Sequence, residues 1–278
     1  MILTGNNRSI DLAGRSKIMG IVNVTPDSFY DGGFHAENEC GVLHGITLFN
    51  QGADILDIGG ESTRPGADPV LEKDEINRTI PVIEGLTHKV NCPISIDTTK
   101  AKVASEALNA GANWVNDVSA GLTDPEILDV VAEWDVPYVA MHMRGTPATM
   151  QKDTAYDDLI DEIKRYFFDR LEVMEKAGVN LDKVILDPGI GFGKAMEHNY
   201  SLLGNLDEFR SFGKPLLVGP SRKSFLKLVG VDDVKERLPG TLAAVTLCAE
   251  AGVEVIRVHD VAEAVQVANV IDMVKKSR

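Results

Sequence analysis

Residues 94–117 read ISIDTTKAKVASEALNAGANWVND and contain one complete strand–helix–strand unit. A short β-branched run comes first and ends at Asp97. A helical pattern follows from Lys100 to Ala110, and Gly111 closes it, as glycine commonly does at the carboxyl end of a helix. A second apolar run then ends at Asn116. The stretch therefore predicts two parallel strands joined by a helix.

Eight such apolar runs recur along the chain, and nearly every one ends in a polar or charged residue. Strand and helix patterns that alternate eight times are typical of a parallel α/β fold, the (β/α)8 or TIM barrel, whose active site lies at the carboxyl ends of the strands. The length of 278 residues suits one such domain, spanning 1–278, and residues 2–12 predict a hairpin that plugs the bottom of the barrel. The runs are Ile18–Val24, Asp54–Ile58, Ile94–Ile96, Trp114–Val115, Tyr138–Met141, Val184–Leu186, Leu216–Val218 and Val255–Val258.

The chain is strongly acidic, with a formal net charge of −14 and a pI near 4.9. A nucleic-acid partner is not expected, because binding to a phosphate backbone needs a basic face. An acidic surface also repels anionic substrates, so such substrates would need a local basic cluster. Candidates for that cluster are Arg64, Lys223, Arg257 and His259.

The three cysteines, Cys40, Cys92 and Cys248, are isolated in the sequence, and no C-x-x-C pair occurs. This pattern favours a reducing compartment over disulfides or a cysteine metal cluster. The sequence shows no signal-peptide pattern and no apolar run of membrane-spanning length. We therefore expect a soluble cytoplasmic protein without a membrane partner.

Asp97, Asn116 and Asp187 are hydrogen-bonding residues at the ends of three predicted strands. Each alone is more often a helix cap or a turn residue. Three on one rim favour a ligand with a dense edge of donors, such as an aminopyrimidinone ring, because buried carboxylates and amides are costly without partners. They do not indicate a metal cluster, because no histidines are interleaved and a catalytic zinc prefers nitrogen or sulfur ligands.

Basic residues lie in or after the last two predicted strands. Arg257 and His259 alternate along a strand and so leave it from the same face, where they could bind phosphate or pyrophosphate. A salt bridge from Arg257 to a carboxylate is an equally good interpretation. Lys223 lies in the basic turn Ser221–Ser224, which could be a solvated turn or could place a cation over the barrel mouth, against an anion or an aromatic ligand.

Three further features carry weaker indications. Asn23 ends the first predicted strand, and its amide oxygen could coordinate Mg²⁺, because hard cations take oxygen ligands and keep several waters. The glycine-rich stretch Gly189–Lys194 is not a P-loop, because Pro188 occupies the required glycine position and Ala195 the hydroxyl position. Its glycines suit a tight turn or close approach to a flat ligand. His142, after the fifth run, is predicted to be a packed core histidine.

Seven motifs together make the chain resemble the dihydropteroate synthase family, the folate-pathway enzymes that sulfonamides target. The resemblance runs essentially end to end. It implies the condensation of 6-hydroxymethyl-7,8-dihydropterin pyrophosphate with 4-aminobenzoate, which releases pyrophosphate, and it suggests a homodimer. The motifs are Met19–Phe29, Asp57–Gly66, Ser95–Thr98, Asn116–Asp117, Leu186–Lys194, Ser221–Ser224 and Ile256–Asp260.

The resemblance also implies a role for each site residue, carried over by position. The pterin would be held by Asp97, Asn116, Asp187 and Lys223, with Met141 and Phe192 as apolar walls. The pyrophosphate and its Mg²⁺ would be bound by Asn23, Arg257 and His259. The aminobenzoate would be framed by Thr63, Arg64, Pro65, Ser224 and Phe29. The residues expected to act on the reacting groups are Asp97, Lys223, Arg257 and His259.

The chemistry of this reaction agrees with these residue types. A neutral aromatic amine needs no base to attack. The protein must therefore stabilise the departing pyrophosphate with Mg²⁺ and cations, and the positive charge left on the pterin methylene with an anion such as Asp97.

One alternative is a pterin-binding methyltransferase barrel that passes a methyl group from methyltetrahydrofolate to a corrinoid protein. That barrel would share the Asp/Asn cradle but would not need Arg64, Lys223 or the Arg257–His259 pair. The resemblance implies that the loops after the first two strands act as a lid. A non-catalytic pterin-binding subunit would be expected to have lost residues of that lid or residues that bind pyrophosphate.

Overall fold

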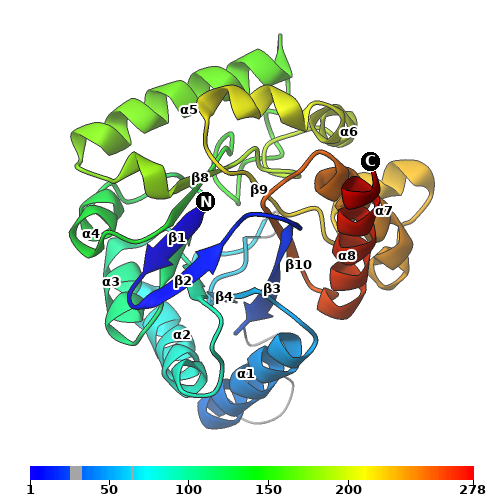
Figure 1. Cartoon of the computed structure of the whole chain (residues 1–278). Helices are drawn as coiled ribbons and strands as arrows, with labels where there is room; N and C mark the ends of the chain where they lie inside the picture. The colour runs from blue at the N-terminus through cyan, green and yellow to red at the C-terminus, as the bar shows by residue number, and fades with distance from the viewer. Residues whose placement is uncertain (26–32, 64–65) are drawn as a thin grey trace.

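Eight short strands form one parallel sheet that curves into a barrel, with helices around it (Figure 1). The computed structural model describes residues 1–25, 33–63 and 66–278. The strand order is β8-β7-β6-β5-β4-β3-β10-β9, and a parallel bridge between Leu186 and Leu216 joins the two edge strands. The predicted (β/α)8 barrel is confirmed. Its strands are β3 (Lys17–Asn23), β4 (Ile55–Gly59), β5 (Ile94–Asp97), β6 (Trp114–Asp117), β7 (Tyr138–Met141), β8 (Val184–Asp187), β9 (Leu217–Val218) and β10 (Val255–Val258).

The helices lie between successive strands. The apolar spacing between Tyr156 and Ala177 predicts a helix within that range, and α5 begins at Leu159, where the Asp158 carboxylate accepts a hydrogen bond from the Asp161 amide at 3.0 Å and caps the helix. Gly178, with φ +86°, follows the C-cap residue Ala177 of this helix. The α-helices are α1 (Gly33–Asn50), α2 (Glu72–Thr87), α3 (Ala101–Asn109), α4 (Ile127–Trp134), α5 (Leu159–Lys176), α6 (Met196–Gly204), α7 (Leu238–Glu250) and α8 (Val261–Ser277). The 3₁₀ helices are η2 (Leu181–Lys183), η3 (Leu206–Phe212), η4 (Ser224–Val229) and η5 (Val234–Glu236). In the described part of the chain, no helix combines the length and apolar character needed to cross a membrane.

The N-terminal hairpin, β1 (Ile2–Gly5) and β2 (Arg8–Asp11), lies across the end of the barrel where the strands begin (Figure 1). Asn6 and Asn7 both have positive φ, which matches the twist of a tight hairpin. Leu3 packs against the inward side chains of the barrel, and the Asn113 amide donates to the Asn6 carbonyl at 3.0 Å. The predicted plug is confirmed, and it leaves the carboxyl ends of the strands as the open mouth.

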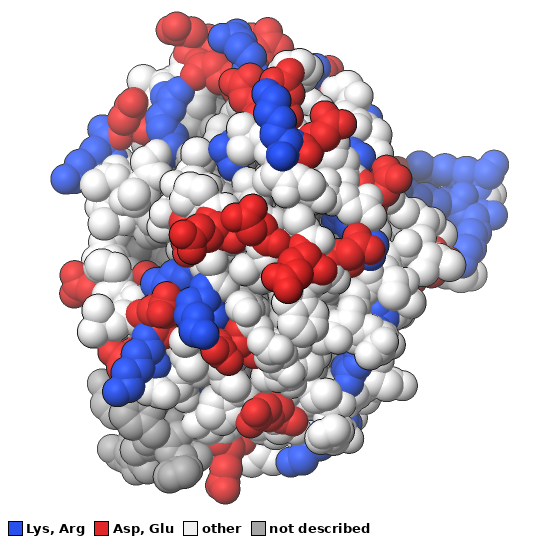
Figure 2. Space-filling model, turned by 90° about the vertical axis from the view of Figure 1, so that its left-hand side faces the viewer, with Lys and Arg blue, Asp and Glu red and all other residues white. Residues whose placement is uncertain are grey.

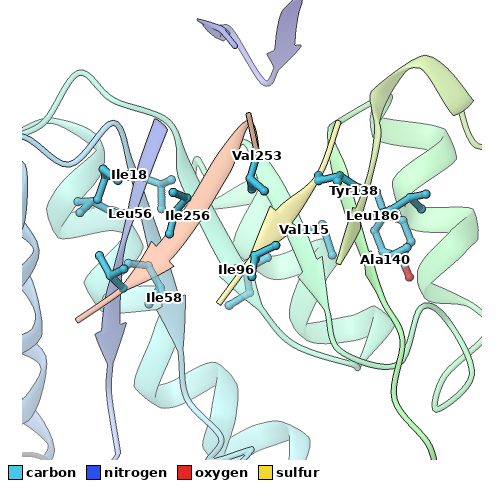
Figure 3. Close-up of a cluster of buried hydrophobic side chains, with 14 of the residues drawn as sticks. Ile18, Leu56, Ile58, Ile96, Val115, Tyr138, Ala140, Leu186, Val253 and Ile256 are labelled. Atoms are coloured by element: carbon cyan, nitrogen blue, oxygen red, sulfur yellow. The ribbon is translucent and has the colours of Figure 1, made fainter. Parts of the chain in front are cut away.

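Side chains alternate along each strand between the helices and the barrel interior. Ile18 and Leu56 face outward into the layer between strands and helices (Figure 3). Their neighbours Met19 and Ile55 belong to a separate apolar cluster inside the barrel, together with Leu3 of the hairpin. This alternation determines which polar residues face the interior near the mouth.

Candidate active site

Polar side chains at the carboxyl ends of the strands lie together inside the barrel. The alternation of side chains along each strand and the parallel register between strands place them there. Asp57 lies two positions after the inward Ile55, and Arg257 lies two positions after the inward Val255. The parallel register also aligns Asn23, Gly59, Asp97 and Asn116 in one row across β3 to β6. The side chains that alternation turns toward the barrel interior are Asn23, Asp57, Asp97, Asn116, Met141, Asp187 and Arg257.

Arg257 joins the carboxylates of two neighbouring strands. Its Nε lies 2.6 Å from Asp57 Oδ2, and its Nη2 lies 2.6 Å from Asp97 Oδ2. Asn116 Nδ2 donates to the same Asp57 oxygen at 2.9 Å. The salt-bridge interpretation of Arg257 is therefore correct for this structure. A guanidinium has five N–H donors, and these two bonds use two of them. The salt bridges are therefore compatible with a role toward pyrophosphate, which stays a prediction.

Opposing effects set the pKa of Asp97. Burial raises its pKa to about 7, although the Arg257 guanidinium favours the ionised form. The Asp57 carboxylate raises it further, because two nearby negative charges repel. Asp97 can therefore change its protonation state near neutral pH.

Lys223 and Asp187 lie on the other side of the mouth. The Lys223 ammonium donates to the Ile190 carbonyl and lies 4.5 Å from the centre of the Phe192 ring, so its aromatic partner here is a side chain of the protein. Burial lowers the pKa of Lys223 to about 8, although the Asp187 carboxylate favours its charged form. Burial likewise raises the pKa of Asp187, whereas Lys223 and a hydrogen bond from the Gly189 amide at 2.7 Å lower it.

The residues of the basic turn Ser221–Ser224 have different partners. Arg222 forms a two-point ion pair with Asp260, with distances of 2.8 Å and 2.6 Å. Ser221 instead contacts His259, with 2.9 Å between Oγ and Nδ1, and this contact fixes the imidazole at the end of β10. Ser224 is exposed at the start of η4.

The predicted apolar walls lie together. Met141 and Phe192 are buried in one cluster with Val118, Met143 and Met150, at the mouth end of the barrel. A cavity of about 250 Å³ opens beside Asp97 and is lined in part by Thr63, Val118 and Met143. Thr63 is thus next to the pterin candidates, whereas Phe29, Arg64 and Pro65 lie outside the described residues.

Asn23 can be tested for its fit to Mg²⁺. A Cβ placed on Gly59 would lie 3.8 Å from Asn23 Oδ1 and 3.7 Å from Asp97 Oδ2, so the glycine leaves room between two oxygens. Oxygen ligands with space for water fit Mg²⁺. Within residues 1–25, 33–63 and 66–278, no group of three or more His, Cys, Asp or Glu residues could hold a metal ion. An ion beside Asn23 would therefore take most of its ligands from a substrate and from water.

Asp57 was missed by sequence reasoning. It is completely buried, and it connects Asn116 to Arg257. The available signal was its place two residues after Ile55, which puts it on the interior face of its strand. Asp117 shows the opposite case: it follows Asn116 directly and so faces outward, where it accepts from the Tyr138 hydroxyl at 2.7 Å.

The outer surface contrasts with the mouth. Figure 2 shows the side of the barrel near α3 and α4, where acidic side chains form a band and basic side chains occur separately among them. The positive charges of Lys223 and Arg257 are instead held inside the barrel mouth. These half-buried cations lie beside the carboxylates of Asp57, Asp97 and Asp187, so the mouth combines charges of both signs.

This geometry has close parallels among known proteins. The family model described as "Pterin binding enzyme" matches residues 19–259. A dihydropteroate synthase from Synechocystis sp. is 47% identical over 263 residues, which cover 94% of this chain and 91% of that protein. The chain belongs to the dihydropteroate synthase family.

Solved structures of the dihydropteroate synthase family have the same fold. The Yersinia pestis dihydropteroate synthase, in a sulfonamide drug complex, has a TM-score of 0.93 and 42% identity, covering 99% of this chain and 100% of that chain. The Xanthomonas albilineans dihydropteroate synthase, with 4-aminobenzoic acid, has a TM-score of 0.92 and 43% identity, covering 99% of each chain. The family resemblance expected from the seven motifs is confirmed.

Proposed function

We propose that this chain condenses 6-hydroxymethyl-7,8-dihydropterin pyrophosphate with 4-aminobenzoate to give 7,8-dihydropteroate and pyrophosphate. The observation that carries the proposal is the set of inward carboxylates, amide and cations at the strand ends, in a chain that is 47% identical to a dihydropteroate synthase. The acceptors Asp97, Asn116 and Asp187 suit the N–H edge of a pterin. The Asn116 amide group is already turned to Asp57, so its carbonyl oxygen remains as the acceptor for a ligand.

The reaction is proposed to be a largely dissociative displacement. The bond between the pterin methylene carbon and the pyrophosphate oxygen breaks, the amine nitrogen forms a new bond to that carbon, and the amine then loses one proton to water. Asp97 would stabilise the positive charge that develops on the pterin, because a fixed anion in a site of low polarity interacts strongly with it. Arg257 and His259 would stabilise the departing pyrophosphate, and Lys223 would hold the pterin against Phe192.

We propose Mg²⁺ as the cofactor, held by Asn23 together with oxygens of the pyrophosphate. The ion would supply neutralisation of the leaving group's negative charge. The space beside Gly59 and the oxygen character of Asn23 support this proposal. The aminobenzoate is proposed to lie against Thr63, Arg64, Pro65, Ser224 and Phe29.

We further propose a cytoplasmic homodimer formed through α8 and its neighbour α7. Val270, Met273 and Val274 are exposed at helical spacing on α8, with Met273 66% exposed, and Leu247 is exposed on α7. Light scattering should give twice the 30.1 kDa of one chain, and Met273→Glu should shift the protein to the monomer. Phe168→Glu on α5, also at an exposed apolar residue, is the control that should leave the dimer intact.

The deciding assay is pyrophosphate release that depends on added 4-aminobenzoate. The folded chain, with Mg²⁺ and the pterin pyrophosphate, should release pyrophosphate only when 4-aminobenzoate is present. Binding of the pterin without release would favour a non-catalytic subunit. Methyl transfer from methyltetrahydrofolate to a corrinoid protein, without pyrophosphate release, would favour the methyltransferase barrel instead.

A further inference from the structure

Lys194 is a buried lysine that the proposed reaction does not use. It ends the glycine-rich turn between β8 and α6, and only 2% of it is exposed. Its Nζ lies 2.9 Å from His142 Nδ1, 3.0 Å from the Phe192 carbonyl oxygen and 3.4 Å from the His142 carbonyl oxygen. An ammonium group has three hydrogens, and these three acceptors match them.

His142 is held from other directions as well. Its backbone amide donates to the Asp187 carbonyl at 2.9 Å, and its ring meets the Tyr166 ring edge-on at 4.8 Å. The Tyr166 hydroxyl in turn donates to the Met141 carbonyl at 3.1 Å. The prediction of a packed histidine is confirmed, and its packing connects it to both apolar walls of the site.

The turn after β8 lies unusually close to His142. A Cβ placed on Gly189 would lie 2.0 Å from the His142 carbonyl oxygen, and Gly189 has φ +72°. Only glycine fits this contact, which lets the Lys194 side chain reach back across the turn. The glycine-rich stretch Gly189–Lys194, which does not match a P-loop, therefore brings two loops of the mouth into direct contact.

The protonation states of Lys194 and His142 allow a hydrogen bond between their side chains. Burial, Lys194 and Arg144 lower the pKa of His142 to about 2, so the ring is neutral and Nδ1 can accept a hydrogen bond. Burial also lowers the pKa of Lys194, whereas the charge of Asp187 opposes that shift. The pair therefore holds no more than one positive charge.

We propose that Lys194 and His142 are a positioning pair that sets the spacing of the two apolar walls, Met141 and Phe192, for the pterin ring. Lys194 holds the Phe192 carbonyl directly, and it holds the residue that follows Met141. Neither side chain reacts with a substrate in this role. The proposal rests on the proposed function, because it names the pterin as the ring whose position the pair determines.

The proposal predicts a selective kinetic effect. In Lys194→Met, which keeps the length of the side chain but removes its donors, the KM for the pterin pyrophosphate should rise about tenfold, which corresponds to about 1.4 kcal/mol. The KM for 4-aminobenzoate and the kcat should change by less than about twofold, because the donors act on the pterin walls. Hydrogen exchange at the amides of residues 189–194 should become faster in the same variant.

His142 supplies the matched pair of variants. Asn in place of His142 retains an oxygen acceptor near the position of Nδ1, so His142→Asn should keep a KM close to that of the parent chain. His142→Leu removes the acceptor and should behave like Lys194→Met. Lys176→Met, at an exposed lysine of α5, is the control and should match the parent chain.

The outcomes separate the two proposals. If the parent chain shows no aminobenzoate-dependent release, the proposed function fails, and pterin affinity is then compared in the same variants by calorimetry. If the parent chain is active and the pterin KM is unchanged in Lys194→Met, the positioning role is wrong. It is also wrong if kcat and both KM values worsen together in Lys194→Met and in His142→Leu. If Lys194→Met does not fold, the comparison of His142→Leu with His142→Asn gives the same decision.

Discussion

Arg257 Nε lies 2.6 Å from Asp57 Oδ2, and Asp57 is completely buried inside the barrel. The same guanidinium contacts Asp97 at 2.6 Å, so one cation connects two carboxylates that would otherwise repel each other. A buried charge that loses its partner is strongly destabilising, because the remaining charge stays away from water. The Arg257–Asp57 pair therefore links the stability of the barrel to the arrangement of its mouth.

Replacement of Asp57 tests this link. Asp57→Ala should lower the free energy of unfolding by about 3–5 kcal/mol, because Arg257 and the Asn116 amide both lose their shared acceptor. Urea unfolding followed by circular dichroism measures the change. Asp57→Asn, which keeps the shape and one oxygen acceptor, should lose less. A loss below about 1 kcal/mol in Asp57→Ala would mean that the pair contributes little.

Asp97→Asn separates catalysis from binding. The variant keeps hydrogen-bonding groups but loses the negative charge, so kcat should fall about 100-fold or more, whereas the affinity for the pterin should change much less. Steady-state kinetics and calorimetry with the pterin substrate alone measure the two quantities. Unchanged turnover would refute the electrostatic role of Asp97.

The pH dependence of kcat/KM for the pterin substrate should be bell-shaped. The rate should rise with pH as Asp97, with a pKa of about 7, becomes ionised, and fall as Lys223, with a pKa of about 8, loses its charge. Asp97→Asn should remove the rising limb, and Lys223→Met should remove the falling limb. A profile that is flat from pH 6 to pH 9 in the parent chain would contradict both assignments.

Asp97 should also make stability depend on pH. Its folded-state pKa of about 7 lies above the ordinary value of 3.8, so the protonated carboxyl favours the folded chain. This contribution is fully present below about pH 4 and is lost as the pH rises through 7. Comparison of the free energy of unfolding of the parent chain and Asp97→Asn between pH 5 and pH 8 measures it. A difference between the two that does not vary with pH would exclude this contribution.

Asn23→Ala should weaken the use of Mg²⁺. The Mg²⁺ concentration for half-maximal activity should rise about tenfold, because the amide oxygen is the only proposed protein ligand and the rest come from substrate and water. Titration of Mg²⁺ after treatment with EDTA measures the shift. Asn109→Ala, on the exposed part of α3, is the control. An identical Mg²⁺ requirement in Asn23→Ala and the parent chain would exclude Asn23 as a ligand.

Much of the architecture could be predicted from local patterns. Runs such as Ile94–Ile96 and glycines such as Gly178 report strand and helix boundaries, because β-branching and backbone freedom act within a few residues. The polar residue after each run could also be placed at the mouth, because parallel strands end on the same side. Asn116 and Asp187 were found in this way.

Contacts between distant strands could not be predicted in the same way. Residues 57 and 257 are separated by 200 positions, and nothing local indicates that Asp57, rather than another of the 42 acidic residues, pairs with Arg257. The contact of Lys194 with His142 likewise depends on how two loops pack. Composition and periodicity determine which residues reach the barrel mouth, because they follow from backbone geometry. Tertiary packing alone decides which of them pair there, because the pairing depends on burial and on distances between side chains from different strands.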